Sequence, residues 1–222
     1  MKSAKRRAEP SRPTIEARLS RADPSLGRVI MAVRARIGPQ RIARSRASPF
    51  EALVRAVVYQ SVSGKAGASI FSRLSEIITK PLTPAKVTAL RPQALAKAGL
   101  SRTKVRTIRE LARWFEVHRK FSGQLHELSD AEIIENLSVI PGIGTWTINV
   151  LLIFNLRRLD VMPTADLGIR RGVQLTDGLR AIATPRQVQL RSQIWSPYRS
   201  IASIYLWQAV KLKLGQKDLG VN

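Results

Sequence analysis

The chain has 222 residues, of which 38 are Lys or Arg and 15 are Asp or Glu, so its formal net charge is +23. Such an excess of positive charge is typical of nucleic-acid-binding proteins, although ribosomal and membrane-surface proteins share it. The absence of cysteine excludes disulfides, thiolate-bound zinc and thiolate-bound iron–sulfur clusters. With 44% hydrophobic residues, the chain can still build a folded core.

Other compositional features narrow the class of protein further. The two histidines, His118 and His126, lie in one surface-like stretch, so neither a side-chain metal site nor a cofactor is expected. No apolar run reaches transmembrane length, and no hydrophobic segment follows the basic N-terminus as it would in a secretory signal. We expect a monomer without a membrane partner, in the cytoplasm with the bacterial nucleoid or in a eukaryotic nucleus.

Residues 1–12 (MKSAKRRAEPSR) are basic and interrupted by proline. They predict a flexible arm that adds nonspecific attraction to phosphate, and residues 13–222 then form the folded domain. The first clear helix signal follows at Ser48-Pro49-Phe50-Glu51, which offers an N-cap, a proline at the first helical position and the glutamate of a capping box. The apolar residues after it have helical spacing and predict a core-facing stripe: Phe50, Leu53, Val54, Val57 and Val58.

Helix signals continue to the C-terminus, and no alternating strand pattern competes with them. Thr83-Pro84 and Thr184-Pro185 predict helix starts, Ser129–Glu132 predicts a capping box, and Gly99 predicts a left-handed helix stop. Two further apolar stripes are Ile70, Leu74, Ile77 and Ile78, and Val105, Ile108, Leu111, Ala112 and Phe115. We expect an all-α fold of about ten helices in two lobes. The chain should cross between the lobes near residues 125–135, and the C-terminal helix should return to the first lobe.

The most informative stretch runs from Leu137 to Thr147 (LSVIPGIGTWT). Pro141 ends one helix, Gly142 and Gly144 permit a tight hairpin, and an apolar helix follows, which places the whole unit at about 131–158. The N–H groups that open the second helix have no partner inside it, so they can bind an anion such as a phosphate. The pattern Pro-Gly-x-Gly at residues 141–144 also occurs in ordinary helix corners, and that interpretation remains open.

Three further residues are candidates for chemistry or base contact. Asp166 precedes a helix beginning at Leu167, where it can act as an N-cap and also present a carboxylate to a cleft. Trp146 directly follows the hairpin glycines, and Trp207 lies near the C-terminus. Tryptophan in a helical protein usually belongs to the core, but one beside a phosphate clamp can stack on an extruded base.

These features resemble the helix-hairpin-helix DNA glycosylase superfamily, and most closely its 3-methyladenine DNA glycosylase II branch. The resemblance covers roughly residues 48–212 in the family's order. Besides the hairpin and Asp166-Leu167-Gly168, three stretches carry it: FEALVRAVVYQSVS at residues 50–63, GLSRTK at residues 99–104, and WSPYRSIA at residues 195–202 continuing to Trp207. The larger relatives carry an N-terminal sheet domain for which this chain has no room, so the compact all-helical members are the better match.

The resemblance also implies roles for individual residues. Asp166 matches the catalytic aspartate, and Trp146 and Trp207 match aromatic residues that line the flipped-base pocket. The hairpin is implied to grip backbone phosphate and to share a monovalent cation through its carbonyls. The implied DNA-binding positions are Gly142, Ile143, Gly144, Thr145, Thr147, Gln60 and Ser61.

Two positions depart from the family pattern. Ser61 stands where a larger wedge residue, such as leucine or glutamine, usually fills the gap left in the duplex. A serine side chain fills little volume, so either the wedge is weak in this protein or a residue of another loop fills the gap in the duplex. Val150 stands where some relatives have an aromatic residue, which suggests a more open pocket.

The reaction type follows from one position. Bifunctional relatives carry a lysine after the hairpin glycines that attacks the sugar, whereas this chain has Trp146 there and no lysine between Lys120 and Lys211. We expect a monofunctional glycosylase that removes alkylated purines such as 3-methyladenine from double-stranded DNA and leaves an abasic site. The alternatives are a noncatalytic DNA-binding or damage-sensing protein with the same hairpin, and a basic structural or RNA-associated helical protein.

Overall fold

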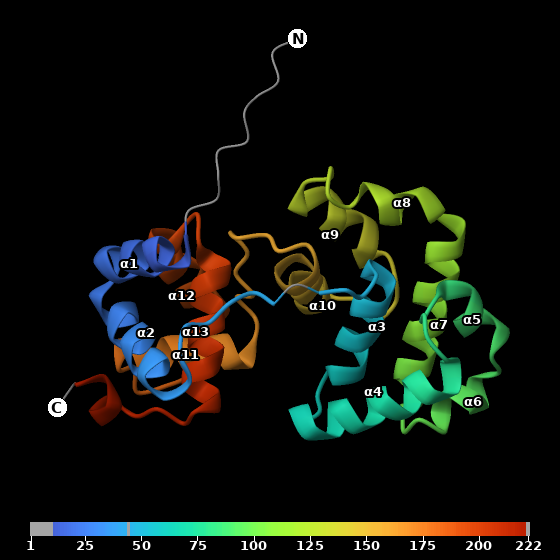
Figure 1. Cartoon of the computed structure of the whole chain (residues 1–222), viewed down its shortest axis with the longest axis horizontal. Helices are drawn as coiled ribbons and strands as arrows, with labels where there is room; N and C mark the ends of the chain where they lie inside the picture. Colours follow the sequence, from blue (N-terminus) through green and yellow to red (C-terminus); the bar gives the residue numbers. More distant parts are fainter. Residues whose placement is uncertain (1–10, 44, 221–222) are drawn as a thin grey trace, which may run out of the picture. The chain divides into compact units, whose positions relative to one another are not determined.

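The computed structural model describes residues 11–43 and 45–220, apart from the side chain of Arg12. Within these ranges every regular element is a helix, as predicted (Figure 1). No helix in the same ranges combines the length and apolarity that a membrane span needs. The elements are α1 (Arg12–Ala22), α2 (Pro24–Ile37), α3 (Pro49–Tyr59), α4 (Gly64–Ile78), α5 (Pro84–Ala89), α6 (Pro92–Ala96), α7 (Arg102–Val117), α8 (Arg119–Gln124), α9 (Asp130–Ser138), α10 (Thr145–Val150), η1 (Leu151–Asn155), α11 (Leu167–Asp177), α12 (Pro185–Arg191), η2 (Ser192–Trp195), α13 (Arg199–Lys211) and η3 (Gln216–Leu219).

The described residues form two compact units. Unit 1 contains residues 11–42 and 159–220, and unit 2 contains residue 43 and residues 45–158. The expected crossing near residues 125–135 is therefore wrong, because this whole stretch lies inside unit 2, as do α8 before it and α9, which begins within it. The expected return of the C-terminal helix is confirmed, since α13 packs against α2 within unit 1.

The N-terminal part of the chain differs from the sequence-based expectation in one respect. The sequence patterns single out no helix before Pro49, yet α1 and α2 both lie there. Helix α1 begins at Arg12, the last residue of the predicted basic arm. Residues 1–10, which make up most of that arm, lie outside the described residues, so the arm stays a prediction.

The core of unit 2 forms where α3 packs against α7. All five residues of the predicted α3 stripe are buried, and so are all five of the α7 stripe. The rings of Phe50 and Phe115 meet between the two helices, with centroids 5.5 Å apart. Burial of a side chain of this size contributes about 1.5–3 kcal/mol, so each of the two rings adds to the stability of unit 2.

The predicted helix ends are largely confirmed. The side chains of Ser48, Thr83 and Thr184 each accept a hydrogen bond from the third residue of their helix. Ser129 and Glu132 form a reciprocal capping box at the start of α9. Such caps contribute about 1 kcal/mol each and fix where the helices begin. The start of α9 matters most for the site, because this helix leads into the hairpin.

Unit 1 is built around α13, which packs against α2 and α11. Helix α13 is buried on most of its surface, as expected for a core helix. It approaches α11 closely at Gly172, where an added Cβ would lie only 2.7 Å from the Cβ of Leu206. This close approach sets the spacing between the two helices that carry Asp166 and Trp207.

A buried carboxylate connects the two halves of unit 1. Asp23 is 3% exposed and caps α2 by accepting hydrogen bonds from the N–H groups of Ser25 and Leu26. It also accepts one from Trp195 Nε1 at 2.7 Å and pairs with Arg191 at 2.6 Å. Burial raises the pKa of Asp23, but the hydrogen bonds from Arg191, Trp195 and Leu26 outweigh it, and the net pKa lies below its usual value. The N-terminal and C-terminal segments are therefore joined by one ionised group.

Asp23→Ala should lower the free energy of unfolding by about 3 kcal/mol, because it leaves Arg191 and the indole N–H without their buried acceptor. Since the folded-state pKa of Asp23 is depressed, its contribution is complete above the unfolded value of about 3.9 and is lost as the pH falls below that value. Urea unfolding of both proteins, at neutral pH and in a series below pH 4, measures this.

Asp177→Ala is the matched control, because Asp177 pairs with the same arginine but its side chain is 23% exposed. It should cost no more than about 1 kcal/mol. Equal losses from the two variants, or a loss from Asp23→Ala that persists unchanged at low pH, would contradict the assignment of a buried ionised carboxylate.

Candidate active site and nucleic-acid interface

Asp166 is fixed in unit 1 at the start of α11. As the N-cap of that helix it has an extended backbone, and its Oδ1 accepts a 2.8 Å hydrogen bond from the N–H of Ile169. The same oxygen accepts a second 2.8 Å hydrogen bond from Nε1 of Trp207 on α13. Two of the predicted site residues therefore meet directly. The N-cap role and the functional role coexist, because capping fixes the carboxylate at the positive end of a helix dipole.

The contact between Asp166 and Trp207 depends on Gly168. A Cβ at this position would lie 2.8 Å from Cδ1 of Trp207 and 3.0 Å from Oδ1 of Asp166. Any side chain would therefore separate the indole from the carboxylate. The glycine of Asp166-Leu167-Gly168 is thus explained by close approach, and Trp207 acts as a donor that orients the carboxylate.

Asp160, the other acidic residue near this segment, has a different environment. Arg199 binds both of its oxygens, at 2.7 Å and 2.9 Å, and the hydroxyl of Ser196 donates to it at 2.9 Å. Burial raises the pKa of Asp160, while the hydrogen bonds from Arg199 and Ser196 lower it further than burial raises it, so the net pKa is depressed. This carboxylate holds the loop before α13 together, which leaves Asp166 as the better candidate for chemistry.

The hairpin in unit 2 turns at Gly142, between α9 and α10. Gly142 has a φ of +86°, in the left-handed region that favours glycine, and the turn is closed by a 3.0 Å hydrogen bond from Ile143 N–H to the carbonyl of Ile140. A Cβ on Gly142 would lie 2.1 Å from Oγ1 of Thr107 on α7. The glycine is therefore required both for its conformation and for its contact with α7.

Gly144 differs from Gly142, because its φ is −96° and a Cβ there would meet nothing within 4 Å. It is the N-cap of α10 but has no side chain to cap the following amides, which leaves this helix end suited to an anion. Helix α10 continues directly into the π-helical turn η1. The predicted apolar helix therefore spans residues 145–155, with α-helical geometry up to Val150 and π-helical geometry after it.

The remaining hairpin residues divide by exposure. Thr145 is exposed beside Gly144, whereas the side chains of Ile143 and Thr147 are 3% and 1% exposed. Those two side chains support the hairpin from inside, and at these positions only the backbone can face a ligand. Trp146 is partly buried in the first turn of α10.

The loop between α3 and α4 contains Gln60 and Ser61. The side-chain amide of Gln60 donates to the carbonyl of Gly142 at 3.2 Å and to Oγ1 of Thr147 at 2.8 Å, so it binds the hairpin. Ser61 has a φ of +53°, an unusual conformation for a residue with a side chain. Its neighbour Val62 is 36% exposed and offers the apolar volume that Ser61 lacks.

The structure brings the predicted site residues together in two groups. Asp166 and Trp207 form one in unit 1, and Gln60, Ser61, Trp146 and the hairpin form the other in unit 2. Among the described residues no group of three or more His, Asp or Glu side chains could hold a metal ion. The hairpin does have backbone carbonyl oxygens, the ligand type that coordinates K⁺ in channel filters, and a monovalent cation site there stays a prediction.

Two supporting residues on α7 were not singled out as functional by the sequence. Lys104 donates to the carbonyls of Val58 and Gln60, and Thr107 contacts Gly142. A signal existed for Lys104, because it closes the family-like stretch of residues 99–104. No sequence pattern singled out Thr107, because its partner, Gly142, lies far away in the sequence.

The known proteins that this chain resembles include several 3-methyladenine DNA glycosylases. DNA-3-methyladenine glycosylase 1 of Schizosaccharomyces pombe is 36% identical over 172 residues, which cover 74% of this chain and 73% of that protein. DNA-3-methyladenine glycosylase 2 of Escherichia coli is 27% identical over 171 residues, covering 71% and 56%. The solved structure of the S. pombe 3-methyladenine DNA glycosylase in complex with abasic DNA matches with a TM-score of 0.80 at 32% identity, covering 89% of this chain and 97% of that one.

A family model described as "HhH-GPD superfamily base excision DNA repair protein" matches residues 54–197, a range that includes the hairpin and Asp166. This match spans more than half of the 222 residues. The chain belongs to the HhH-GPD superfamily of base excision DNA repair proteins.

Proposed function

We propose that this protein is a monofunctional DNA glycosylase that hydrolyses the N-glycosidic bond of alkylated purines, such as 3-methyladenine, in double-stranded DNA and leaves an abasic site. The observation that carries the proposal is the carboxylate of Asp166, fixed by two N–H donors in a chain of a base excision repair family. The substrate class is inferred from its relatives, two of which are named 3-methyladenine glycosylases.

The geometry of Asp166 suits the charge that develops in the reaction. Breaking the bond between the sugar and the base produces oxocarbenium character on the sugar ring, as in other glycoside hydrolyses. A carboxylate whose Oδ1 is held by Ile169 and Trp207 is oriented before the substrate arrives, so it can stabilise that cation without reorganising. The same carboxylate can orient the attacking water.

The leaving group needs little help from the protein. An alkylated purine such as 3-methyladenine already carries positive charge and departs as a neutral base, so no strong general acid is required. Selectivity then arises from the lower cost of extruding a weakly paired base and from stacking an electron-poor ring on an aromatic side chain. We assign the stacking role to Trp146 and Trp207.

The absence of lyase chemistry follows from the position of Trp146. An indole cannot form a Schiff base with the opened sugar, and the sequence between residues 121 and 210 contains no lysine. Lys104, the lysine that contacts the Gln60 loop, already donates to two backbone carbonyls. Water is therefore the nucleophile, and the abasic site is released uncut.

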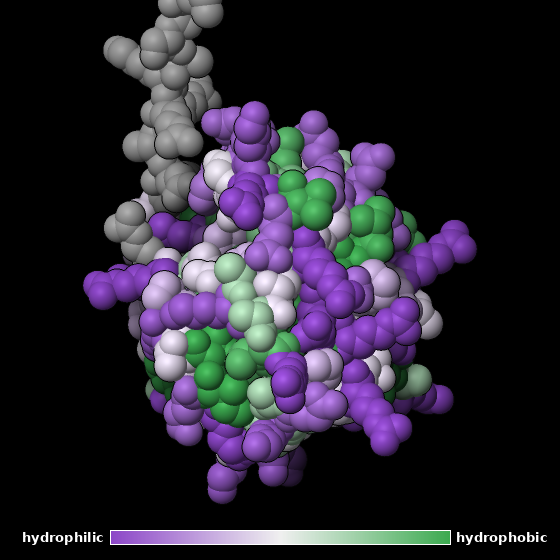
Figure 2. All heavy atoms as spheres, turned by 90° about the vertical axis from the view of Figure 1, so that its right-hand side faces the viewer, coloured by the Kyte–Doolittle hydropathy of each residue, from purple (hydrophilic) through white to green (hydrophobic). Residues whose placement is uncertain are grey.

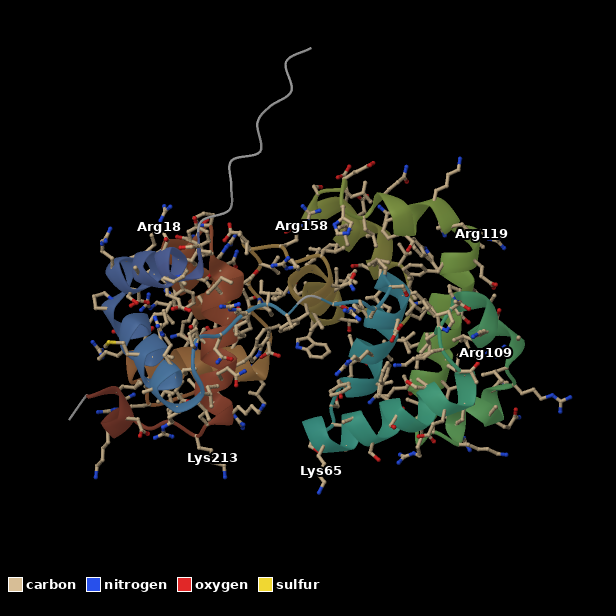
Figure 3. All side chains as sticks on the ribbon, viewed as in Figure 1. Arg18, Lys65, Arg109, Arg119, Arg158 and Lys213 are labelled. Carbon is tan, nitrogen blue, oxygen red and sulfur yellow. The ribbon has the colours of Figure 1, made fainter. Side chains whose placement is uncertain are left out.

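The binding partner is double-stranded DNA, held at the phosphate backbone by the hairpin and by distributed positive charge. Arginine and lysine side chains extend from both units, among them the labelled Arg18, Lys65, Arg109 and Lys213 (Figure 3). Hydrophilic side chains also cover much of the face of unit 2 in Figure 2, with apolar patches between them. This charge gives affinity without sequence preference, as a repair enzyme that must scan DNA requires.

A noncatalytic DNA-binding protein with the same hairpin is the alternative. The two donors on Asp166 argue against it, because a pure cap needs only the N–H of Ile169 and has no need of Trp207. An enzyme acting on chromosomal DNA would work in the nucleoid or the nucleus, and we propose that it does so as a monomer.

Asp166→Asn should reduce release of 3-methyladenine from methylated duplex DNA at least 100-fold, because it removes the charge that stabilises the sugar cation. Asparagine also caps helices well, so folding and binding to abasic-site DNA should be retained. Base release is measured by chromatography, and binding by fluorescence anisotropy. Wild-type excision by this variant would refute the assignment and direct attention to Asp160.

Borohydride should trap no covalent complex between this protein and DNA containing an excisable base, because no amine takes part in the proposed reaction. Denaturing gels of the quenched reaction test this. An 8-oxoguanine glycosylase/lyase such as the one from Clostridium acetobutylicum serves as the positive control on its own substrate. A trapped adduct that maps to a lysine of this chain would show that the enzyme is bifunctional.

Salt titration should separate the two sources of DNA affinity. Deleting residues 1–12 removes Lys2, Lys5, Arg6, Arg7 and Arg12, so the salt dependence should flatten and affinity for all duplexes should fall about equally. Gly144→Glu places a carboxylate where the phosphate approaches and should abolish binding to damaged and undamaged duplex even at low salt.

The hairpin variant is well suited to this test, because a side chain at Gly144 meets no atom within 4 Å and the fold should tolerate it. Circular dichroism checks that it is folded. If the folded variant keeps wild-type affinity, the segment Pro141–Gly144 is only a helix corner and DNA binds elsewhere.

A further inference from the structure

Lys104, in the first turn of α7, binds the C-terminal end of α3. Its Nζ donates hydrogen bonds to the carbonyl oxygens of Val58, at 2.8 Å, and Gln60, at 2.7 Å. Carbonyls in the last turn of a helix have no partner inside the helix and lie at the negative end of its dipole, so an ammonium group stabilises them. Burial lowers the pKa of Lys104, as expected for an amine that has exchanged part of its hydration for these two contacts.

Gln60 extends this contact to the hairpin. Its backbone carbonyl is held by Lys104, while its side-chain amide donates to the carbonyl of Gly142 and to the hydroxyl of Thr147. One residue thus connects the loop between α3 and α4 with the turn between α9 and α10. These contacts all lie within unit 2.

Helix α7 contacts the hairpin directly as well. Thr107, one turn after Lys104, is 4% exposed, and its hydroxyl occupies the space beside Gly142 that a Cβ would need. The first two turns of α7 therefore contact both loops: Lys104 binds the loop after α3, and Thr107 packs against the hairpin. The relative position of the loops is set by a helix that belongs to neither.

We propose that Lys104 is a positioning residue for DNA binding: it fixes the loop at Gln60–Ser63 and, through Gln60, the phosphate-binding hairpin, so that both meet the duplex in one arrangement. This inference rests on the proposed function, because it takes the hairpin and the loop to be DNA-contacting elements. Lys104 touches no substrate atom in this scheme, although it is one of the 38 cationic side chains of the chain.

Two other roles for Lys104 predict different measurements. A lysine that contacts a phosphate directly contributes about 0.9 to the slope of log K against log salt, and its loss reduces that slope. A lysine that only caps α3 changes the stability of unit 2 and leaves the hairpin unaffected. Loss of a positioning lysine weakens DNA binding without changing the slope of log K against log salt, and the size of the loss depends on whether Gln60 is present.

The experiment compares Lys104→Met, Gln60→Met, the double variant and Lys65→Met as wild-type-length proteins on a duplex containing an abasic-site analogue. Methionine is unbranched, matches glutamine in length, is one atom shorter than lysine, and removes the donors of both side chains. Lys65, near the start of α4, is exposed and controls for loss of one positive charge close to the same loop. Affinity is measured across a salt series well below each melting temperature.

Lys104→Met and Gln60→Met should each weaken binding about tenfold, the change expected when a hydrogen bond with a positioning role is lost. The salt slope should equal that of the wild type, and the double variant should be no weaker than the worse single variant, because both act on one pathway. Hydrogen exchange at the amides of residues 143–145 should quicken in all three. Lys65→Met should leave hairpin exchange unchanged.

A reduced salt slope in Lys104→Met would overturn the proposal in favour of a direct phosphate contact. Additive losses, or hairpin exchange that stays at the wild-type rate, would overturn it in favour of a cap confined to α3. The proposed enzymatic function fails separately, if wild-type protein releases no methylated purine. The binding and exchange results for Lys104 can then still be read, because neither measurement requires turnover.

Discussion

The contact between Gly142 and Thr107 is the constraint on which the arrangement of unit 2 around the hairpin depends. A hairpin that exposes backbone amides to a ligand has few internal hydrogen bonds to stabilise it, so it must be held from outside. Here the buried face of α7 holds it, and only a residue without Cβ can come so close. The hairpin, the Gln60 loop and α3 then form a single packed assembly, anchored where α7 crosses them.

The carboxylate site in unit 1 follows the same physical logic. Gly168 brings the indole of Trp207 within hydrogen-bond distance of Asp166, much as Gly142 brings the hairpin against Thr107. In both places a missing side chain lets a rigid helix approach a group that must face its ligand. The half-buried carboxylate is thereby held in one orientation before any ligand arrives, which is the arrangement that electrostatic preorganisation requires.

Much of the fold could be predicted from local pattern, because apolar spacing and capping chemistry are local properties. The stripes of α3 and α7, the caps at Ser48 and Ser129 and the hairpin glycines are of this kind. The positions where the chain passes between the two units could not be predicted, since they depend on which helices pack together. Thr107 and the hydrogen bond from Trp207 to Asp166 were equally inaccessible, because each needs a partner 35 or more residues away.

The division of the chain between the units has a consequence for biosynthesis. Unit 2 is continuous in sequence, so all of its helices are available once the ribosome has released residue 158. Unit 1 combines the first two helices with α11, α12 and α13, and it stays incomplete until α13 has been synthesised. Domains generally fold as units during synthesis, N-terminal ones first, and here the discontinuous unit completes last. A chain terminated soon after residue 158 would carry the hairpin but lack both Asp166 and Trp207, the carboxylate of unit 1 and the donor that orients it.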